Sequence, residues 1–332
     1  MVVELKKDIS SEKAQELAHA TKSIFIDNDT KVLVTFSSVK ELPKELEAYT
    51  DNFFVTPTDL QLASRIYKPE TISVKIGKNV EIGGNTNNTL MMAGPCSVES
   101  EEQIEEVAQF LIKNDIKVLR AGSYKPRTSP YSFQGMGLDG LKLLAKMREK
   151  YGLSIITEVR DYSHIEEIIE YSDVVQVGAK AMYDQGILRR CGKANIPVLI
   201  KRGFGSTLQE FAQAAEFVLS GGNENVILCE RGIRTFEFNT RFTLDLCGVA
   251  WLKDKTNLPI VLDPSHALGA RYGIADLSRA CVAMGIDGLL IETHPDPSVA
   301  KSDAAQQLDF KMFEEMNASL KAVANAVGRV MI

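Results

Sequence analysis

Eight short apolar runs, each followed by a longer amphipathic stretch, constrain the fold of this chain more than any other feature of its sequence. Strand-length runs that alternate with helical patterns indicate parallel strands connected by helices. Eight such units in succession are typical of a (β/α)8 TIM barrel, which is an α/β fold. The expected strands are residues 89–95, 117–124, 153–160, 174–179, 197–204, 225–232, 258–266 and 287–294. Helices are expected to begin after the capping residues Ser100, Thr207 and Asp303.

An open doubly wound sheet is the alternative that this alternation allows. Such sheets commonly carry a glycine-rich dinucleotide turn. Gly94, Gly203 and Gly205 form too sparse a pattern to indicate such a turn. The barrel is therefore favoured.

The N-terminal part has a different pattern from the barrel. Residues 1–70 read as strand, helix, two strands, helix and strand, the order of a small α+β ferredoxin-like domain. Residues 71–86 contain two alternating runs around a Gly-Lys turn, which predicts a hairpin or linker that caps the N-terminal end of the barrel. We therefore expect a small domain at 1–70, a hairpin at 71–86 and a catalytic barrel at 87–332.

The composition excludes several classes of protein. The 332 residues are 45% hydrophobic and 25% charged, which suits a globular chain with a large core. The formal net charge of −6 gives no reason to expect nucleic acid or a membrane surface as a partner. No apolar run approaches the roughly 20 residues of a membrane span, and five scattered cysteines fit reduced thiols. These observations predict a cytoplasmic protein.

Basic residues interrupt the expected strands at their C-terminal ends, where barrel enzymes assemble their active sites. Lysine and arginine are seldom buried without an anionic partner, and both bind phosphates and carboxylates. Each residue alone could be a solvated strand end, but six around one rim argue for a multiply anionic substrate. The six are Arg120, Lys125, Arg127, Lys180, Lys201 and Arg231.

A second set of residues at the same rim offers metal-ligand chemistry. Cys96, His266, Glu292 and Asp303 could hold one divalent ion of intermediate softness, such as manganese, iron, cobalt or zinc. They show no local ligand spacing. Taken singly, they are a core cysteine, a loop histidine, a salt-bridge partner and a helix cap, so only the closed barrel makes them candidates.

Seven ordered motifs between residues 89 and 308 resemble 3-deoxy-D-arabino-heptulosonate 7-phosphate (DAHP) synthase, in the branch with an N-terminal ferredoxin-like regulatory domain. They are MAGPCSVES (92–100), LRAGSYKPRTSPYSFQGMG (119–137), LIKRGF (199–204), ILCERGIRTFE (227–237), DPSH (263–266), IETHPDP (291–297) and KSDAAQQL (301–308). The resemblance implies the first step of the shikimate pathway, in aromatic amino-acid biosynthesis. In that step phosphoenolpyruvate condenses with D-erythrose 4-phosphate and water.

The resemblance also implies a role for each candidate residue. It makes the cysteine, histidine and two acids the metal ligands, and it assigns Arg127 and Thr128 to erythrose 4-phosphate. Lys180 is a departure, because many relatives carry an arginine there and a lysine loses the bidentate fork. Phosphoenolpyruvate is assigned to Arg120, Lys125, Lys180, Lys201 and Arg231.

Our mechanistic hypothesis makes Lys125 the proton donor to the new alkoxide and Glu158 the group that handles the water. Three alternatives stay open. They are 3-deoxy-octulosonate 8-phosphate synthase, disfavoured by the intact KPRTSP at 125–130, a binding protein with a decayed rim, and a lyase with Lys201 as Schiff-base nucleophile. For the N-terminal domain, the resemblance implies inhibition by an aromatic amino acid such as tyrosine or phenylalanine, and a cap or oligomerisation element is the alternative of equal weight. A homo-oligomer, dimer or tetramer, is also expected.

Overall fold

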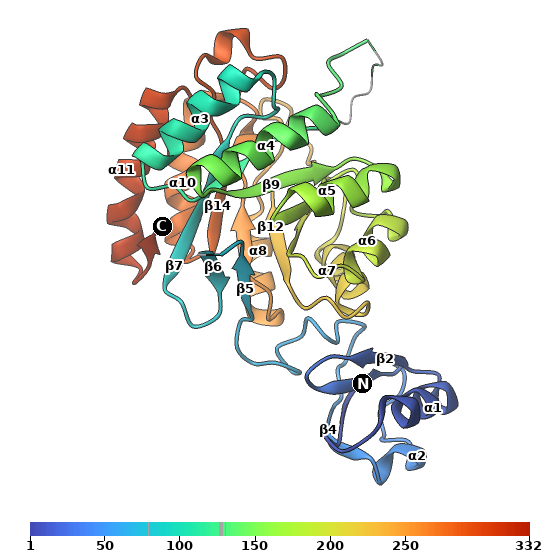
Figure 1. Ribbon diagram of the computed structural model, residues 1–332. Coiled ribbons are helices and arrows are strands. Elements are labelled where there is room, and N and C mark those ends of the chain that lie inside the picture. Colours follow the sequence, from blue (N-terminus) through green and yellow to red (C-terminus); the bar gives the residue numbers. More distant parts are fainter. Residues whose placement is uncertain (79, 126–128, 130) are drawn as a thin grey trace.

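A closed barrel of eight parallel strands forms the centre of the protein (Figure 1). The computed structural model describes residues 1–332 except 79, 126–128 and 130. The strands are β7 (Asn88–Gly94), β8 (Val118–Arg120), β9 (Ser154–Val159), β10 (Val174–Val177), β11 (Val198–Lys201), β12 (Val226–Glu230), β13 (Ile260–Leu262) and β14 (Gly288–Glu292). The barrel closes because β14 pairs with β7, from Gly288 beside Leu90 to Glu292 beside Gly94. All eight predicted strands are confirmed, and each observed strand is no longer than its predicted run.

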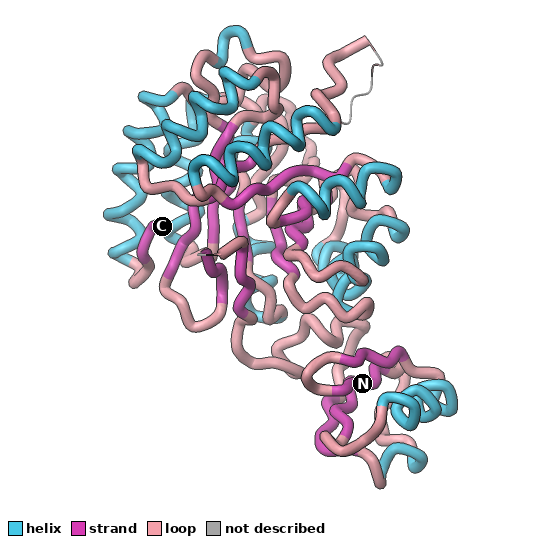
Figure 2. Tube along the Cα trace, viewed as in Figure 1, coloured by secondary structure: helices cyan, strands magenta, loops and turns pink. Residues whose placement is uncertain are grey.

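Helices cover the outside of the barrel (Figure 2). They are α3 (Glu101–Lys113), α4 (Leu138–Tyr151), α5 (Ile165–Tyr171), α6 (Gln185–Gly192), α7 (Leu208–Leu219), α8 (Leu246–Lys255), α10 (Ile274–Ala283) and α11 (Phe310–Ala326), with a short α9 (Pro264–Leu268) after β13. Ser100 caps α3, and Thr207 forms a capping box with Glu210 at α7, as predicted. The predicted helix start at Asp303 is wrong, since α11 begins at Phe310 and is capped by Asp309.

Alternate residues of the barrel strands face two separate apolar layers. On β12, Val226 and Leu228 pack outward against the helices, whereas Ile227 and Cys229 point into the barrel interior. This alternation follows from the two-residue period of a strand. The strands are therefore buried on both sides, which explains why each reads as a continuous apolar run.

A two-stranded hairpin fills the end of the barrel at which the strands begin. Strands β5 (Ser73–Ile76) and β6 (Val80–Gly83) pair in an antiparallel ladder. Its buried side chains belong to the same apolar cluster as the barrel interior: Val74, Ile76, Val80 and Ile82. The hairpin is also fixed by a 2.7 Å hydrogen bond from the Ile72 N–H to the carbonyl of Asn257, just before β13.

A small antiparallel sheet with two helices lies at the same end of the molecule, below the barrel in Figure 1. Val2, Ile26, Val32 and Val34 of its strands belong to the same apolar cluster as the outer layer of the barrel. Its elements are β1 (Val2–Leu5), α1 (Ser11–Thr21), β2 (Ile24–Asp27), β3 (Lys31–Val34), α2 (Lys44–Glu47) and β4 (Thr50–Phe54), and the strand order is β2-β3-β1-β4. It has its own apolar core, which includes Met1, Leu17 and Leu33. Among the described residues, no helix combines the length and the apolar composition needed to cross a bilayer.

Candidate active site

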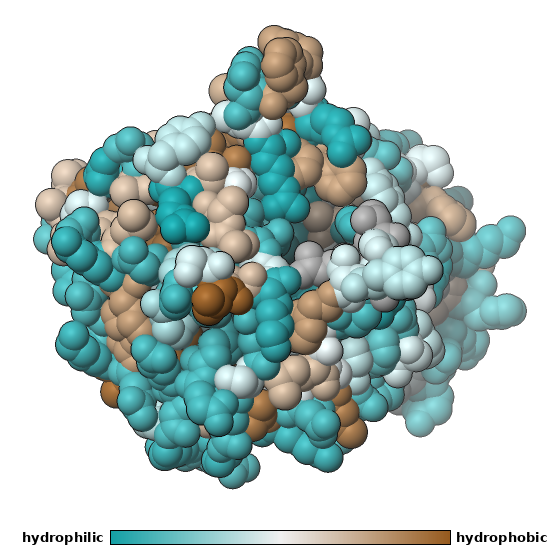
Figure 3. All heavy atoms as spheres, turned by 90° about the horizontal axis from the view of Figure 1, so that it is seen from above, coloured by the Kyte–Doolittle hydropathy of each residue, from teal (hydrophilic) through white to brown (hydrophobic). Residues whose placement is uncertain are grey.

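Polar side chains from most of the barrel strands and their loops converge at the C-terminal end of the barrel. They surround a pocket of about 290 Å³. Its lining residues are Lys125, Glu158, Ala179, Lys180, Lys201, Phe204, Arg231, Arg241, Phe242, His266 and Asp303. This end is uppermost in Figure 1, opposite the N-terminal sheet, and the view from above in Figure 3 shows a mainly hydrophilic face. The rim predicted from the sequence therefore exists as one site.

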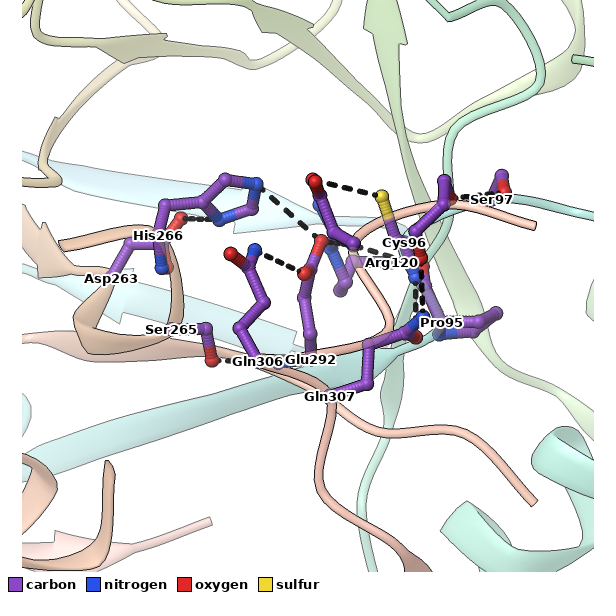
Figure 4. Close-up of polar contacts among 12 residues, drawn as sticks. Pro95, Cys96, Ser97, Arg120, Asp263, Ser265, His266, Glu292, Gln306 and Gln307 are labelled. Atoms are coloured by element: carbon purple, nitrogen blue, oxygen red, sulfur yellow. Dashed lines mark hydrogen bonds and ion pairs between the residues drawn. The ribbon is translucent and has the colours of Figure 1, made fainter. Parts of the chain in front are cut away.

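The end of β7 is shaped by a glycine. Gly94 has φ +149°, and a Cβ atom there would lie 2.2 Å from the carbonyl oxygen of Arg120. Only glycine allows this close approach of β7 and β8. The approach lets the Arg120 guanidinium donate to the carbonyl of Pro95 at 2.8 Å, and it places Cys96 beside Arg120 (Figure 4).

Three of the four predicted metal ligands meet in one cluster. The ligand atoms of Cys96, Glu292 and Asp303 all lie within 4.8 Å of one another, with the thiol 3.4 Å from the Asp303 carboxylate. His266 adjoins the cluster, because its Nε2 lies 3.4 Å from Glu292 Oε1. A thiolate, an imidazole and two carboxylates suit a divalent ion of intermediate softness, so the donor set fits such an ion.

Charges and burial act in opposite directions within this cluster. Burial raises the pKa of the Glu292 carboxyl group, but the positive charges of His266 and Arg120 outweigh burial and lower that pKa to about 2. Arg120 donates to Glu292 at 2.7 Å. Burial raises the pKa of the Cys96 thiol to about 12, and the Glu292 carboxylate acts in the same direction. A divalent ion would therefore displace a proton from Cys96 on binding its thiolate.

Asp263 is a site residue that sequence reasoning missed. Its fully buried carboxylate lies 2.6 Å from Lys201 Nζ and 2.7 Å from His266 Nδ1, and it accepts the His266 backbone N–H at 3.0 Å. Burial alone would raise the pKa of Asp263, but His266 and Lys201 hold it well below its usual range. Asp263 fixes the imidazole so that Nε2 faces Glu292 (Figure 4).

The pocket contains cations that lack acidic partners. Arg231 is only 5% exposed, yet within the described part of the chain no carboxylate pairs with it, and its Nη1 has no hydrogen-bond partner. Its guanidinium lies 4.2 Å from the Phe242 ring, and burial lowers its pKa. A buried, unpaired guanidinium is costly unless a ligand supplies the anion. Lys180 lines the same pocket but is exposed to solvent.

Lys125 and Glu158, the two predicted catalytic residues, line the same pocket. The Lys125 ammonium donates to the carbonyl of Cys96 at 2.9 Å and lies 3.1 Å from its sulfur. Burial lowers the pKa of Lys125, but the adjacent Cys96 sulfur and the Glu158 and Glu292 carboxylates outweigh burial and raise it. Glu158 accepts from Gln176 at 2.7 Å and packs against Gly178, where a Cβ atom would lie 2.4 Å from its carboxylate.

Two further arginines lie near this end of the barrel, and only Arg241 lines the pocket. Arg202, which follows Lys201, points away from the pocket and pairs with Glu230 at 2.9 Å and Asp245 at 2.8 Å. Arg241 lies far from any predicted strand but lines the pocket. The sequence carries no local signal for Arg241, because its loop approaches the pocket only in the folded barrel. Arg127 and Thr128 lie outside the described residues.

Comparisons with known proteins show which family this chain is similar to. The profile described as the DAHP synthetase I family matches residues 69–329. A phospho-2-dehydro-3-deoxyheptonate aldolase of Thermotoga maritima is 45% identical over 81% of this chain and 78% of its own length. A 2-dehydro-3-deoxyphosphooctonate aldolase of Syntrophotalea carbinolica is 33% identical over 77% of this chain and 96% of its own. A crystal structure of the Thermotoga maritima enzyme, also called DAHP synthase, matches 100% of this chain and 99% of its own, with a TM-score of 0.81 at 38% identity.

Proposed function

Because this chain belongs to the DAHP synthetase I family, we propose that it condenses phosphoenolpyruvate with D-erythrose 4-phosphate and water. The products are 3-deoxy-D-arabino-heptulosonate 7-phosphate and phosphate, as in the first step of the shikimate pathway. The observation that carries this proposal is the buried Arg231, unpaired with any acid of the described chain, next to a thiol, imidazole and carboxylate cluster. The weaker alternative is the octulosonate synthase reaction, because that relative is 33% rather than 45% identical.

Phosphoenolpyruvate is the ligand that suits the cations of the pocket. Arg231, Lys180 and Lys201 would bind its phosphate and carboxylate, since planar guanidinium groups and ammonium groups both recognise such oxygens. Arg120 Nη1 already donates to Glu292 and Pro95, whereas its buried Nε has no partner among the residues that the structure describes. That free donor would be satisfied by the same substrate. Arg127 and Thr128 would bind the phosphate of erythrose 4-phosphate.

Cys96, His266, Glu292 and Asp303 would hold one divalent ion, which could be Mn2+, Fe2+, Co2+ or Zn2+. When bound, the ion would supply Lewis acidity toward the aldehyde oxygen or orient the attacking water. Asp263 would keep the imidazole of His266 in the orientation that a ligand needs.

The reaction joins C3 of phosphoenolpyruvate to the aldehyde carbon, adds water at C2 and breaks the C–O bond to phosphate. Lys125 would give a proton to the alkoxide that forms from the aldehyde. An ammonium held among Cys96 and Glu158 keeps that proton until the alkoxide develops. Glu158 would accept a proton from the water. The pocket cations would balance the charge of both substrates throughout.

The N-terminal part would regulate this reaction. We assign residues 1–70 to a ferredoxin-like regulatory domain, 71–86 to the hairpin and linker, and 87–332 to the catalytic barrel. The β-α-β-β-α-β element order and the antiparallel sheet support the first assignment. An aromatic amino acid would be the inhibitor. A homo-oligomer, dimer or tetramer, and a cytoplasmic location complete the proposal, the latter supported by five unpaired cysteines.

The experiment that tests the reaction is the loss of phosphoenolpyruvate absorbance with erythrose 4-phosphate or with arabinose 5-phosphate as acceptor, each with Mn2+. We expect turnover with the four-carbon aldose. Preference for the five-carbon aldose would move the assignment to the octulosonate synthase. Silence with both would indicate a binding protein.

A further inference from the structure

We propose that the adjacent glutamines Gln306 and Gln307 are positioning residues that fix two different metal ligands, Glu292 and Cys96, from a single turn of chain. The inference rests on the metal site of the proposed function. Gln306 is 2% exposed and Gln307 is fully buried, so water does not replace the protein contacts of either amide. In Figure 4 the two side chains extend in different directions, one toward Glu292 and the other toward the loop of Cys96.

The Gln306 amide is held at both ends. Its NH2 group donates to Glu292 Oε2 at 2.6 Å, and its carbonyl accepts from Arg241 Nη1 at 2.8 Å. The orientation of the amide is settled by chemistry, because a guanidinium can only donate and an ionised carboxylate can only accept. Arg120 takes the other oxygen of the same carboxylate. Glu292 is therefore clamped between two donors that set its rotamer.

Gln307 acts on the thiol side of the cluster. Its carbonyl accepts the backbone N–H of Cys96 at 2.9 Å, and its NH2 group donates to the carbonyl of Ser302 at 2.8 Å. Ser302 in turn shares a 2.6 Å hydrogen bond with Ser97. The turn that carries Asp303 is thereby joined to the loop that carries Cys96.

The turn that carries Asp303 is also strained at this aspartate, which is one of the proposed metal ligands. Asp303 has φ +45°, a left-handed conformation that residues other than glycine seldom adopt. The Gln306 N–H donates to its carbonyl at 3.2 Å, which closes the turn. Gln306 and Gln307 thus hold Glu292 and Cys96 in place around an aspartate whose backbone is already constrained. Contacts of this kind orient metal ligands and commonly contribute roughly 10- to 100-fold to metal affinity.

Gln306→Met and Gln307→Met keep the side-chain length and remove the hydrogen bonds, so Co2+ binding to the metal-free full-length protein tests the two roles separately. The thiolate-to-Co2+ charge-transfer band reports on Cys96. Its absence in Cys96→Ser would identify it as the band of that thiolate. We expect Gln306→Met to weaken Co2+ binding roughly 10-fold or more while the band is retained. Gln307→Met is expected to shift or weaken the band itself. Gln306→Leu replaces the methionine variant if that variant does not fold.

Gln213→Met on α7 is the matched control, because the Gln213 NH2 group has no hydrogen-bond partner in the described part of the chain and lies outside the site. It should leave both Co2+ affinity and the band unchanged. Wild-type affinity in Gln306→Met would overturn the role of Gln306, and an unchanged band in Gln307→Met would overturn that of Gln307. A wild-type protein that binds no Co2+ would instead overturn the metal site, and the inference with it.

Discussion

Lys125 brings its ammonium group within 3.1 Å of the Cys96 sulfur, at the boundary between the ligand cluster and the cationic pocket. Replacement by methionine keeps the stem and removes the proton donor. We expect Lys125→Met to lower kcat by at least about 100-fold, the usual contribution of a positioned general acid, while the fold is kept. Phosphate release and the thermal midpoint measure the two effects. Lys142→Met, on the exposed face of α4, is the control, and near-normal turnover in Lys125→Met would remove Lys125 from the mechanism.

Sequence reasoning reached some of the site residues and could not reach others. Cys96 and Glu292 could be found because each interrupts or follows an apolar strand. Their grouping came from the expected closure of the barrel, and the family resemblance implied the same set. Asp263 stands in the quoted motif at 263–266, but nothing in one sequence shows that its carboxylate lies between Lys201 and His266. Such partners become neighbours only through barrel closure, which no local pattern records.

At the scale of elements, the β5–β6 hairpin closes the end of the barrel at which the strands begin. Ile76 is fully buried with the barrel interior, whereas Lys75 on the other face of the same strand is exposed. We expect Ile76→Ala to lower the free energy of unfolding by about 2–5 kcal/mol, because it removes buried methyl groups and leaves a cavity. Lys75→Ala should change it by less than about 0.5 kcal/mol. Urea unfolding measures both, and equal effects would contradict this packing.

The periodic elements were predictable, and the irregular ones were not. All eight barrel strands followed from their apolar runs, since parallel strands buried on both faces leave a strong signal. The helix start predicted at Asp303 was wrong because Asp303 precedes a stretch of good helix formers at 304–308, which lies in the turn after β14. The amides of Gln306 and Gln307 are used by Glu292 and Cys96 instead, so tertiary contacts override local propensity.

At the scale of the whole molecule, a buried carboxylate is among the contacts that join the N-terminal part to the barrel. Glu216 on α7 accepts the backbone N–H groups of Gln61 and Ala63 at 2.7 and 2.9 Å and that of Leu62 at 3.2 Å. The sequence carries no signal for this contact, because the order of elements does not show which part of the barrel the N-terminal part contacts. Burial raises the pKa of Glu216 to about 7, against an opposing effect of the three N–H groups.

This shift makes the stability of the junction depend on pH. Between the ordinary carboxyl pKa of 4.5 and about 7, the folded protein holds a proton that the unfolded chain has released. Stability from this group is therefore full below pH 4.5 and is lost as the pH rises toward 7. Relative to Glu216→Gln, the wild type should lose at most about 3 kcal/mol of unfolding free energy across this window. Urea unfolding at several pH values measures the difference, and a pH-independent difference would count against the shift.

The central claim is that the cysteine, histidine and two acids at the rim make this barrel a metal-dependent synthase. The most direct test is turnover of phosphoenolpyruvate with erythrose 4-phosphate by the full-length protein after exhaustive chelation, with metal content measured on the same sample. We expect activity to vanish and to return on addition of Mn2+, but not in Cys96→Ser or His266→Ala. Full activity in a sample shown to contain no metal would contradict the claim.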